Sequence, residues 1–238
     1  TQVPTQAPPS ERVCRIRVQF AKTASMALLS HLDLMRLLER ALRRSALPIS
    51  FTGGFHPLPR LQIALALPLG AEAQGEWMDL EFTEALDPNH FRQTLQPSLP
   101  EGIQLLRAVE VPVSGKSLSQ ELTGAVWCFD LVPEQQMALP LDWHAAVDQL
   151  LQAKTLMWHD TDKKGRPRER DCRPALKALH LIDQNTSGSV RLRLEAAVDE
   201  MGRSLRPSQI QHWLAETVGQ PLQVQRLARE ALLLSVQC

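Results

Sequence analysis

Tyrosine is absent from this sequence of 238 residues, and aromatic residues make up only 5% of it. Few aromatic platforms are therefore available for stacking the bases of a single-stranded nucleic acid. Long apolar runs are also missing, since no stretch approaches the roughly 18 uncharged residues that a membrane-spanning helix requires. The first ten residues, TQVPTQAPPS, contain neither a basic segment nor an apolar core. We therefore do not expect them to be a signal peptide.

Residues 1–11 are rich in Pro, Gln and Thr, a composition typical of a flexible linker. The sequence starts at Thr1 and lacks an initiator Met. Together these features suggest that the chain is a fragment of a longer protein.

The cysteines show no arrangement that would hold a metal. The four residues (Cys14, Cys128, Cys172 and Cys238) contain no CxxC pair and no spacing suited to zinc. We expect no metal site and no disulfide, but reduced thiols, two or three of them buried in strands. Reduced thiols are typical of a cytoplasmic protein.

Hydrophobic residues make up 44% of the chain and charged residues 22%, as in a globular protein of two domains. The net charge is zero, but it is unevenly distributed. Residues 1–70 carry nine basic and three acidic side chains, residues 71–150 carry three and thirteen, and residues 151–238 carry fourteen and ten. The arrangement of two basic blocks around an acidic one is more informative about binding partners than the net charge is.

Hydrophobic periodicity and helix-capping residues predict the same order of elements in both halves. In the first half we expect strands at 12–20, 49–51, 61–67, 76–82 and 103–111 and helices at 30–45 and 87–95. In the second half we expect strands at 125–132, 155–159, 191–198 and 222–234 and helices at 143–152 and 207–218. Between 159 and 191 we expect an inserted basic hairpin followed by a short helix.

This order predicts the α+β class, with two tandem ferredoxin-like (βαββαβ) domains, the second carrying the inserted basic hairpin. After the linker at 1–11, the first domain spans 12–112 and the second 123–238. A segment near 112–122 joins them.

The first predicted helix carries four arginines, Arg36, Arg40, Arg43 and Arg44, opposite its apolar stripe. At 100° per residue these side chains fall within an arc of about 100°. The planar guanidinium binds two phosphate oxygens at once, so this ridge is a candidate anion-binding surface. An ordinary solvated helix face is the alternative.

A second candidate is the loop Gly53-Gly54-Phe55-His56-Pro57-Leu58-Pro59-Arg60. Paired glycines with positive φ can turn successive N–H groups toward an anion. Phe55 and His56 can stack on a base, and Arg60 can reach a phosphate. A structural turn that binds nothing is equally open.

The third candidate is the basic segment 163–173, with Gly165 and Pro167 favouring a hairpin turn. The candidate RNA-binding residues of this segment are Lys164, Arg166, Arg168, Arg170 and Arg173. Alternatively, Asp171 and Arg173 form an internal ion pair that fixes the base of the hairpin.

Two histidines are weak candidates for a catalytic acid or base. His31 lies in the first turn of the first helix, on its apolar side, where a backbone carbonyl would satisfy it; His56 lies in the glycine loop. Asp79 and Glu81 share one face of a strand and Glu76 the other. We expect these carboxylates to face solvent rather than to bind a cation.

Four segments together resemble one family. They are LSHLDLMRLLERALRR (29–44), GFHPLPR (54–60), PLGAEAQGEWMDLEF (68–82) and KGRPRERDCRPAL (164–176). They resemble the radical-SAM-linked proteins of bacteria, whose members are encoded beside, or fused to the C-terminus of, a radical-SAM protein with a cobalamin-binding-type domain. The resemblance implies a radical-SAM protein as partner, in cis or in trans, and that partner would carry the iron-sulfur cluster and S-adenosylmethionine. This chain lacks the CxxxCxxC triplet that holds such a cluster, and we expect no cofactor in it.

We therefore expect an accessory domain that binds the substrate of a radical-SAM enzyme, with transfer or ribosomal RNA as that substrate. Two alternatives remain. One is a metal-independent endoribonuclease similar to the tandem ferredoxin-like enzymes that process CRISPR repeats, although their glycine-rich C-terminal loop is missing here. The other is a protein-docking domain for the radical-SAM core.

Overall fold

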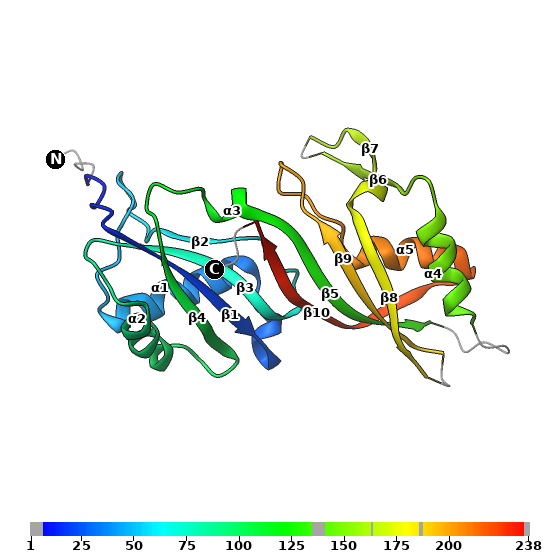
Figure 1. Cartoon of the computed structure of the whole chain (residues 1–238), viewed down its shortest axis with the longest axis horizontal. Coiled ribbons are helices and arrows are strands. Elements are labelled where there is room, and N and C mark those ends of the chain that lie inside the picture. Colours follow the sequence, from blue (N-terminus) through cyan, green and yellow to red (C-terminus); the bar gives the residue numbers. More distant parts are fainter. Residues whose placement is uncertain (1–6, 135–140, 163, 186–187, 236–238) are drawn as a thin grey trace. The chain divides into compact units, whose positions relative to one another are not determined.

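The computed structural model describes residues 7–134, 141–162, 164–185 and 188–235. The chain divides into two compact units (Figure 1). Unit 1 contains the residues up to Leu122 together with Ser235, and unit 2 is Thr123–Leu234. No helix in the described part of the chain is long and apolar enough to cross a membrane.

Unit 1 is a four-stranded sheet with helices. Its main elements are β1 (Cys14–Lys22), α1 (His31–Ser45), β2 (Leu61–Ile63), β3 (Glu72–Phe82), α2 (Pro88–Leu95), β4 (Ile103–Val111) and α3 (Leu118–Glu121), with 3-10 turns at Ala24–Leu28 and Gln96–Ser98. β1 is central, between β4 and β3, and β2 pairs with the other edge of β3. All these pairings are antiparallel.

The two main helices of unit 1 begin where their capping residues predict. Ser30 caps α1, and its hydroxyl accepts the Asp33 amide at 3.2 Å. Asp87 caps α2 in the same way and accepts the amide of His90 at 2.8 Å, with Pro88 at the first helical position. Each cap satisfies an amide that the helix itself leaves without a partner.

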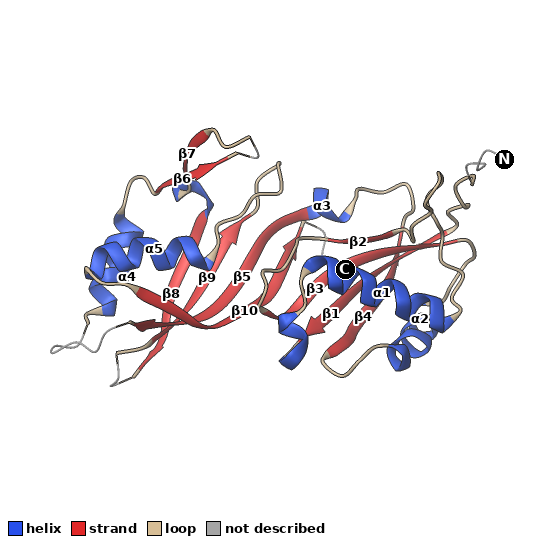
Figure 2. Cartoon of the chain, turned by 180° about the vertical axis from the view of Figure 1, so that it is seen from behind, coloured by secondary structure: helices blue, strands red, loops and turns tan. Residues whose placement is uncertain are grey.

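The core of unit 1 lies between one face of its sheet and the helices. α1 and α2 lie side by side on that face (Figure 2). Alternate strand residues point into the core, which is why the apolar residues of β1 and β3 are buried together with one face of α1. The main contributors are Ile16, Val18, Phe20, Met78, Leu80, Phe82, Leu34, Leu38, Ala41, Leu42 and Phe91.

Unit 2 also combines a sheet with two helices. Its elements are β5 (Leu122–Pro133), α4 (Trp143–Gln152), β6 (Met157–Thr161), β7 (Pro167–Asp171), a 3-10 turn (Arg173–Ala175), β8 (Leu176–Gln184), β9 (Val190–Ala197), α5 (Pro207–Val218) and β10 (Leu222–Leu234). The strand order is β10-β5-β9-β8. α4 and α5 contact each other, and they contact β8 and β10 respectively.

The expected hairpin is present, but it takes a strand that we had placed in the sheet. The strand predicted at 155–159 is β6, which pairs with β7 and forms a separate two-stranded sheet. The sheet position is filled instead by β8, where we expected a short helix. The sequence LKALHLIDQ contains good helix formers at helical spacing, and pairing with β9 overrides that local preference. Only the 3-10 turn Arg173–Ala175 remains of the predicted helix.

Two predicted strands of unit 1 are shorter than expected. Ile49 and Phe51 form only isolated bridges, to Phe82 and Pro59 respectively. The strand predicted at 61–67 ends at Ile63 as β2. The chain at 49–60, before β2, therefore forms isolated bridges and turns and not a continuous strand.

Candidate functional site

The arginines of α1 differ in what they contact. Arg44 donates to the carbonyl of Ser98 at 2.6 Å, and Arg36 lies 3.5 Å from an Asp33 oxygen with both side chains exposed. Arg40 and Arg43 are exposed, and within the described residues neither has an ion-pair partner. Three of the four predicted arginines, Arg36, Arg40 and Arg43, are therefore available to a ligand, whereas Arg44 anchors α1 to the turn after α2.

The glycine loop is built for packing rather than for anion capture. Gly54 has a φ of 107°, which an L side chain rarely adopts, whereas Gly53 does not have positive φ. The Gly54 amide donates to the carbonyl of Ala7 at 2.9 Å. A Cβ on Gly53 would come within 3.0 Å of Pro9. The predicted nest of N–H groups is therefore wrong, because the N-terminal segment occupies that side of the loop.

The rest of the loop is open to solvent. Thr52 fixes its base, because its amide donates to the carbonyl of Leu58 and its hydroxyl accepts the Leu58 amide at 3.0 Å. Phe55, His56 and Leu58 are exposed. The two aromatic side chains that the sequence offered for stacking are thus presented on a fixed base.

A groove of about 350 Å³ joins this loop to α1. The helix contributes Met35 and Glu39, and the two central strands contribute charged residues. The full lining is Arg15, Met35, Glu39, Thr52, Leu58, Pro59, Arg60, Leu61, Gln62, Asp79 and Glu81. On α1, Arg43 lies about 40° round the helix from Glu39 and Arg36 about 60° round it. Two segments that the sequence singled out separately therefore border one groove.

Asp79, which lines the groove, belongs to a group of buried charges. Arg17 is 1% exposed and Asp79 5%, and they are joined by bonds of 2.8 Å from Nε to Oδ1 and 3.0 Å from Nη2 to Oδ2. Arg17 also donates to the carboxylate of Glu121 in α3. The expectation that Asp79 faces solvent is wrong, since the segment that carries α3 covers this face of the sheet. Glu76 is also buried, on the core face.

Glu81 is held by two arginines at the rim. Arg12 donates to Glu81 Oε1 at 2.6 Å, and Arg60 Nε lies 3.8 Å from Oε2. Arg60 therefore borders the groove, next to a carboxylate that already has a closer partner. Glu81 is only half-buried.

Arg15 lies in the wall of the groove and is 5% exposed. Its Nη2 donates to the carbonyl of Lys116 at 3.1 Å. Its Nε is 3.9 Å from Asp79, beyond hydrogen-bonding distance. Among the described residues, Nε of Arg15 and Nε of Arg60 are buried without a hydrogen-bond partner. Unsatisfied buried donors of this kind are rare in folded proteins.

Sequence reasoning missed Arg15, Arg17 and Glu121. Both arginines alternate with apolar residues in β1, which is the ordinary pattern of a half-exposed strand. A signal was present in Ser117 and Gln120, which form the capping box of α3, although no helix was predicted there.

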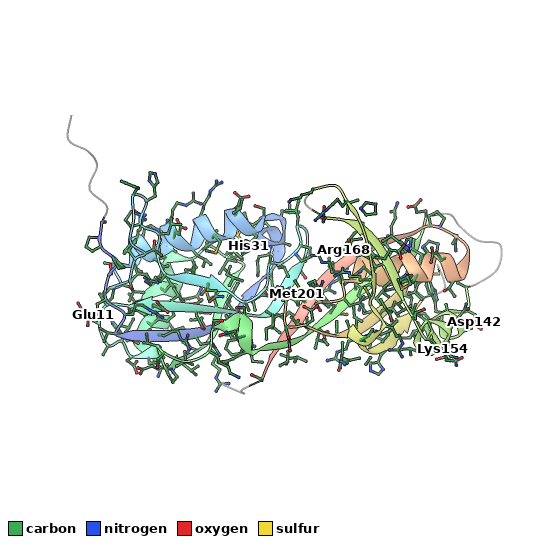
Figure 3. All side chains as sticks on the ribbon, turned by 90° about the horizontal axis from the view of Figure 1, so that it is seen from above. Glu11, His31, Asp142, Lys154, Arg168 and Met201 are labelled. Carbon is green, nitrogen blue, oxygen red and sulfur yellow. The ribbon has the colours of Figure 1, made fainter. Side chains whose placement is uncertain are left out.

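His31 is half-buried at the start of α1 (labelled in Figure 3). It lines a cavity of about 10 Å³ with the buried side chains of Lys22 and Glu76. Such a space holds no more than one water molecule. In the described part of the chain the imidazole has no hydrogen-bond partner, so the backbone carbonyl we expected to satisfy it is not found.

Two arginines of the inserted hairpin are paired with carboxylates of the same hairpin. Arg166 binds Asp162, with 2.7 Å between Nε and Oδ2. Arg168, labelled in Figure 3, binds both oxygens of Asp160, at 2.9 and 3.0 Å. Hydrogen bonding to Arg168 lowers the pKa of Asp160 and raises that of Arg168. Lys164 is exposed.

Arg173 and Asp171 fix the base of the hairpin, but not through an ion pair with each other. Arg173 donates to the carbonyls of Leu151 and Ala153 at 2.9 Å and of Leu176 at 3.2 Å. Asp171 accepts the amides of Leu156 at 2.8 Å and Arg173 at 2.9 Å. Arg173 thus binds carbonyls at the end of α4 that the helix leaves unsatisfied, and its expected role in binding RNA is not favoured.

The hairpin is attached to α5 by aromatic contacts. The ring of Trp158 meets those of His212 and Trp213 edge to face, at centroid distances of 5.4 and 6.0 Å. Trp213 Nε1 donates to the carbonyl of Met157 at 3.2 Å. Arg170 is half-buried, and its Nε has no hydrogen-bond partner among the described residues.

The cysteines are free thiols wherever the structure describes them. Cys14 lies in β1 and Cys172 follows β7, both buried, while Cys128 in β5 is half-buried. Burial raises the pKa of all three. Cys238 lies outside the described residues. Within the described ranges, no three His, Cys, Asp or Glu side chains come together as metal ligands.

These features define a protein of the α+β class with mainly antiparallel sheets. Residues 15–207 match the model of the family described as "Uncharacterized protein conserved in bacteria (DUF2344)", and the chain belongs to this family. No curated protein matches the chain.

Solved structures resemble the chain in fold. A chain in the crystal structure of a Cbf5-Nop10-Gar1 complex is 10% identical with a TM-score of 0.52, and the match covers 91% of this chain and 48% of that chain. A chain in the crystal structure of the archaeal box H/ACA sRNP Nop10-Cbf5 complex is 9% identical with a TM-score of 0.47, and the match covers 90% of this chain and 46% of that chain. The chain thus spans about half the length of these matched chains. At such low identity the first of these likenesses shows the fold alone.

Proposed function

We propose that this chain is an RNA-binding accessory domain of a radical-SAM enzyme system, and that RNA binds to unit 1 over α1 and the loop at 52–62. One observation carries the proposal: α1 and the loop line the same groove. Arg36, Arg40 and Arg43 of α1 and the exposed Phe55 and His56 of the loop do not line this groove themselves, and we assign them to the surface around it.

The two sides of this surface suit different parts of an RNA. Exposed arginines without strong internal partners bind phosphates, because the guanidinium fork matches two phosphate oxygens. Exposed rings on a fixed loop stack on unpaired bases, the usual targets of proteins that read RNA sequence. With few aromatic residues in the chain, stacking at one or two positions is what the composition allows.

The inserted hairpin is a weaker candidate for the same role. Arg166 and Arg168 are each engaged by an aspartate of the hairpin, so binding a phosphate would require breaking that pair. Arg173 is engaged by backbone carbonyls. Lys164 and Arg170 remain as secondary candidates on this element.

The proposal of a radical-SAM partner rests on the resemblance carried by four motifs, at 29–44, 54–60, 68–82 and 164–176. Three of them coincide with α1, with the loop beside the groove and with β3, so the motifs that carry the resemblance also build the proposed surface. The partner would supply the iron-sulfur cluster and S-adenosylmethionine, while this chain would present the RNA.

We also propose that both units are ferredoxin-like. In unit 1 the order β4-β1-β3-β2 supports this, with α1 and α2 on one face. Unit 2 has the equivalent order β10-β5-β9-β8 once the hairpin is set aside. Sheets of this kind leave loops and helices at their edges available for RNA. The fold match to the Cbf5-Nop10-Gar1 complex supports only the α+β architecture.

The test is fluorescence anisotropy with labelled bulk transfer RNA at low and at physiological salt. We expect binding that weakens steeply with salt, because the arginines displace counterions from the phosphates. The variant Arg40→Glu/Arg43→Glu should bind much more weakly and with a shallower salt dependence.

The matched control is Lys154→Glu/Lys177→Glu, which changes the net charge equally through exposed residues of unit 2. It should leave the affinity for transfer RNA within about twofold of the wild type, since non-contacting charges are screened. Equal losses in both variants would show a non-specific charge effect. No binding at low salt would overturn the RNA proposal, and co-purification with the radical-SAM core after nuclease treatment would then test protein docking.

A further inference from the structure

The groove of unit 1 has an unusual lining. Its walls include the apolar side chains of Met35, Leu58, Pro59 and Leu61. Between these walls lie both cationic and anionic groups. The combination excludes a purely apolar occupant and is typical of pockets in which a few polar groups orient a ligand.

The anionic groups of the groove differ in what they already bind. Asp79 is engaged by two bonds from Arg17, and Glu81 is engaged by Arg12. Glu39 is half-buried, and in the described part of the chain its carboxylate has no ion-pair partner. Glu81 Oε2 accepts no hydrogen bond among the described residues, but Arg12 Nε lies 2.6 Å from it as an ion-pair partner. Glu39 is therefore the carboxylate of the groove that can accept hydrogen bonds from a ligand without leaving an arginine.

Two arginines of the groove lack hydrogen-bond acceptors. Arg15, only 5% exposed, has no hydrogen-bond acceptor for its Nε among the described residues, and the same holds for Arg60. Glu81 is 3.8 Å from Arg60 Nε, and Asp79 is 3.9 Å from Arg15 Nε. A ligand acceptor in the groove would supply the missing partner once either guanidinium turns toward it.

We infer that the groove is a pocket for a single guanine base. Guanine carries two acceptors, O6 and N7, on the edge that arginine binds most often, and two donors, the N1–H and the N2 amino group, that suit a carboxylate. Arg60, backed by Arg15, meets the acceptor edge, and Glu39 meets the donors. Met35 and Leu58 pack on the faces of the ring.

The other bases match this set less well. Adenine has no carbonyl oxygen and presents an amino group to the arginines, and cytosine and uracil lack the second ring that spans the groove. The volume of about 350 Å³ suits one nucleotide and not a stacked run. This inference rests on the proposed function, because it names the part of the RNA that unit 1 reads.

Isothermal titration of the full chain with GMP, AMP, CMP and UMP tests it. All four carry the same phosphate, so any difference in affinity comes from the base. We expect GMP to bind about tenfold or more tighter than the other three, since a hydrogen-bonding site discriminates strongly against a ligand that lacks the matching groups. Equal affinities for all four, or no binding of GMP, would overturn the guanine pocket.

Two variants locate the binding. Glu39→Gln and Arg60→Gln should each weaken GMP binding about tenfold or more and leave the weak binding of AMP unchanged. Glu84→Gln and Arg107→Gln are the matched controls, because both residues are exposed in unit 1 and neither lines the groove. Thermal melts confirm that all four variants fold. Undiminished GMP binding by Glu39→Gln and Arg60→Gln would show that the pocket lies elsewhere.

A final experiment distinguishes two possible ligands of the pocket, a guanine within RNA and a free guanine nucleotide. Single-stranded oligoribonucleotides that differ only by one G or A are compared by anisotropy, and the G-containing strand should bind tighter in the wild type but not in Glu39→Gln. If transfer RNA binds while neither GMP nor the G-containing strand is preferred, the pocket fails and the RNA surface remains. If GMP binds while transfer RNA does not, the RNA proposal fails and the pocket remains.

Discussion

Arg17 and Asp79 form a two-point ion pair in the interior of unit 1, with 2.8 Å from Nε to Oδ1 and 3.0 Å from Nη2 to Oδ2. They face each other in the register of β1 and β3, on the side of the sheet away from the main core. Glu121, from α3, accepts a further hydrogen bond from the same guanidinium. The pair is thus enclosed by a segment that lies 104 residues after Arg17 in sequence.

Removing Asp79 should destabilise unit 1 strongly. Asp79→Ala leaves Arg17 buried with one carboxylate in place of two, and breaking a buried pair on one side costs about 3–5 kcal/mol. Urea denaturation followed by circular dichroism measures the free energy of unfolding. Asp33→Ala, at an exposed position of α1, is the comparison and should cost about 1 kcal/mol through the loss of its weak contacts near the cap. Equal losses of unfolding free energy in the two variants would mean that the buried pair stabilises unit 1 no more than the exposed Asp33 does.

Arg173 should contribute to the stability of unit 2 and not to the binding of RNA. Arg173→Ala removes hydrogen bonds to three backbone carbonyls, and we expect a loss of about 2–3 kcal/mol in the unfolding of unit 2. Arg166→Ala removes only an exposed pair within the hairpin and should cost under about 1 kcal/mol. Chemical denaturation gives both values, and anisotropy with transfer RNA should be unchanged for Arg173→Ala. A fall in RNA affinity without a fall in stability would reverse this assignment.

The base of the hairpin should loosen in acid. Hydrogen bonds from the amides of Leu156 and then of Arg173 hold the pKa of Asp171 below its ordinary value. Because the folded-state pKa lies below the unfolded value of about 3.9, this stabilisation is fully present above that pH and is lost as the pH falls toward the folded-state pKa. Hydrogen-exchange protection of the Leu156 amide should therefore drop below about pH 4.

Asp171→Asn provides the control for this acid effect. Its side chain does not ionise, so the protection of the Leu156 amide should be weaker at neutral pH and show no step below about pH 4. The same step in the variant would assign the acid sensitivity to another carboxylate. Asp160 is the next to consider, because hydrogen bonding to Arg168 also lowers its pKa.

The described thiols should react slowly in the native protein. Burial raises the pKa of Cys14 and Cys172, so little thiolate is present at neutral pH, and both side chains are shielded from reagents. In a Cys128→Ser/Cys238→Ser background, which leaves the two buried thiols, titration with Ellman's reagent at pH 7.5 should detect little thiol until denaturant is added. Rapid reaction of Cys172 in the native state would indicate that the hairpin opens readily.

Helix ends were the most predictable part of the fold. The residues that begin α1 and α2 carry side chains that cap amides within their own first turn, so the information is local. The helices predicted at 143–152 and 207–218 were likewise confirmed as α4 and α5. In each case the apolar spacing and the boundary signals agreed.

Strand partners were less predictable, because they depend on residues far away in sequence. The segment at 176–184 has the local character of a helix and becomes β8 only because β9 pairs with it. β6 was located within two residues but placed in the wrong sheet, since strand character says nothing about the partner.

The candidate site was predicted in pieces. The exposed arginines of α1 and the loop residues Phe55, His56 and Arg60 were singled out from local composition. The groove that α1 and this loop line together depends on tertiary packing, and so does the burial of Arg15 and Asp79. A strand that alternates arginine with apolar residues looks half-exposed until a later segment covers it.

The bond between Arg17 and Glu121 spans 104 residues of sequence, which has a consequence for synthesis. At about 5–20 residues per second, roughly 5–20 s separate the translation of the two residues. During that interval unit 1 cannot complete the enclosure of Arg17, and at its end all strands of the unit's sheet have been made while α3 has not. A nascent chain halted before α3 therefore exposes an unfinished, charged sheet face to chaperones and proteases. The ten residues after β4 thus determine when the charged face of this sheet is covered.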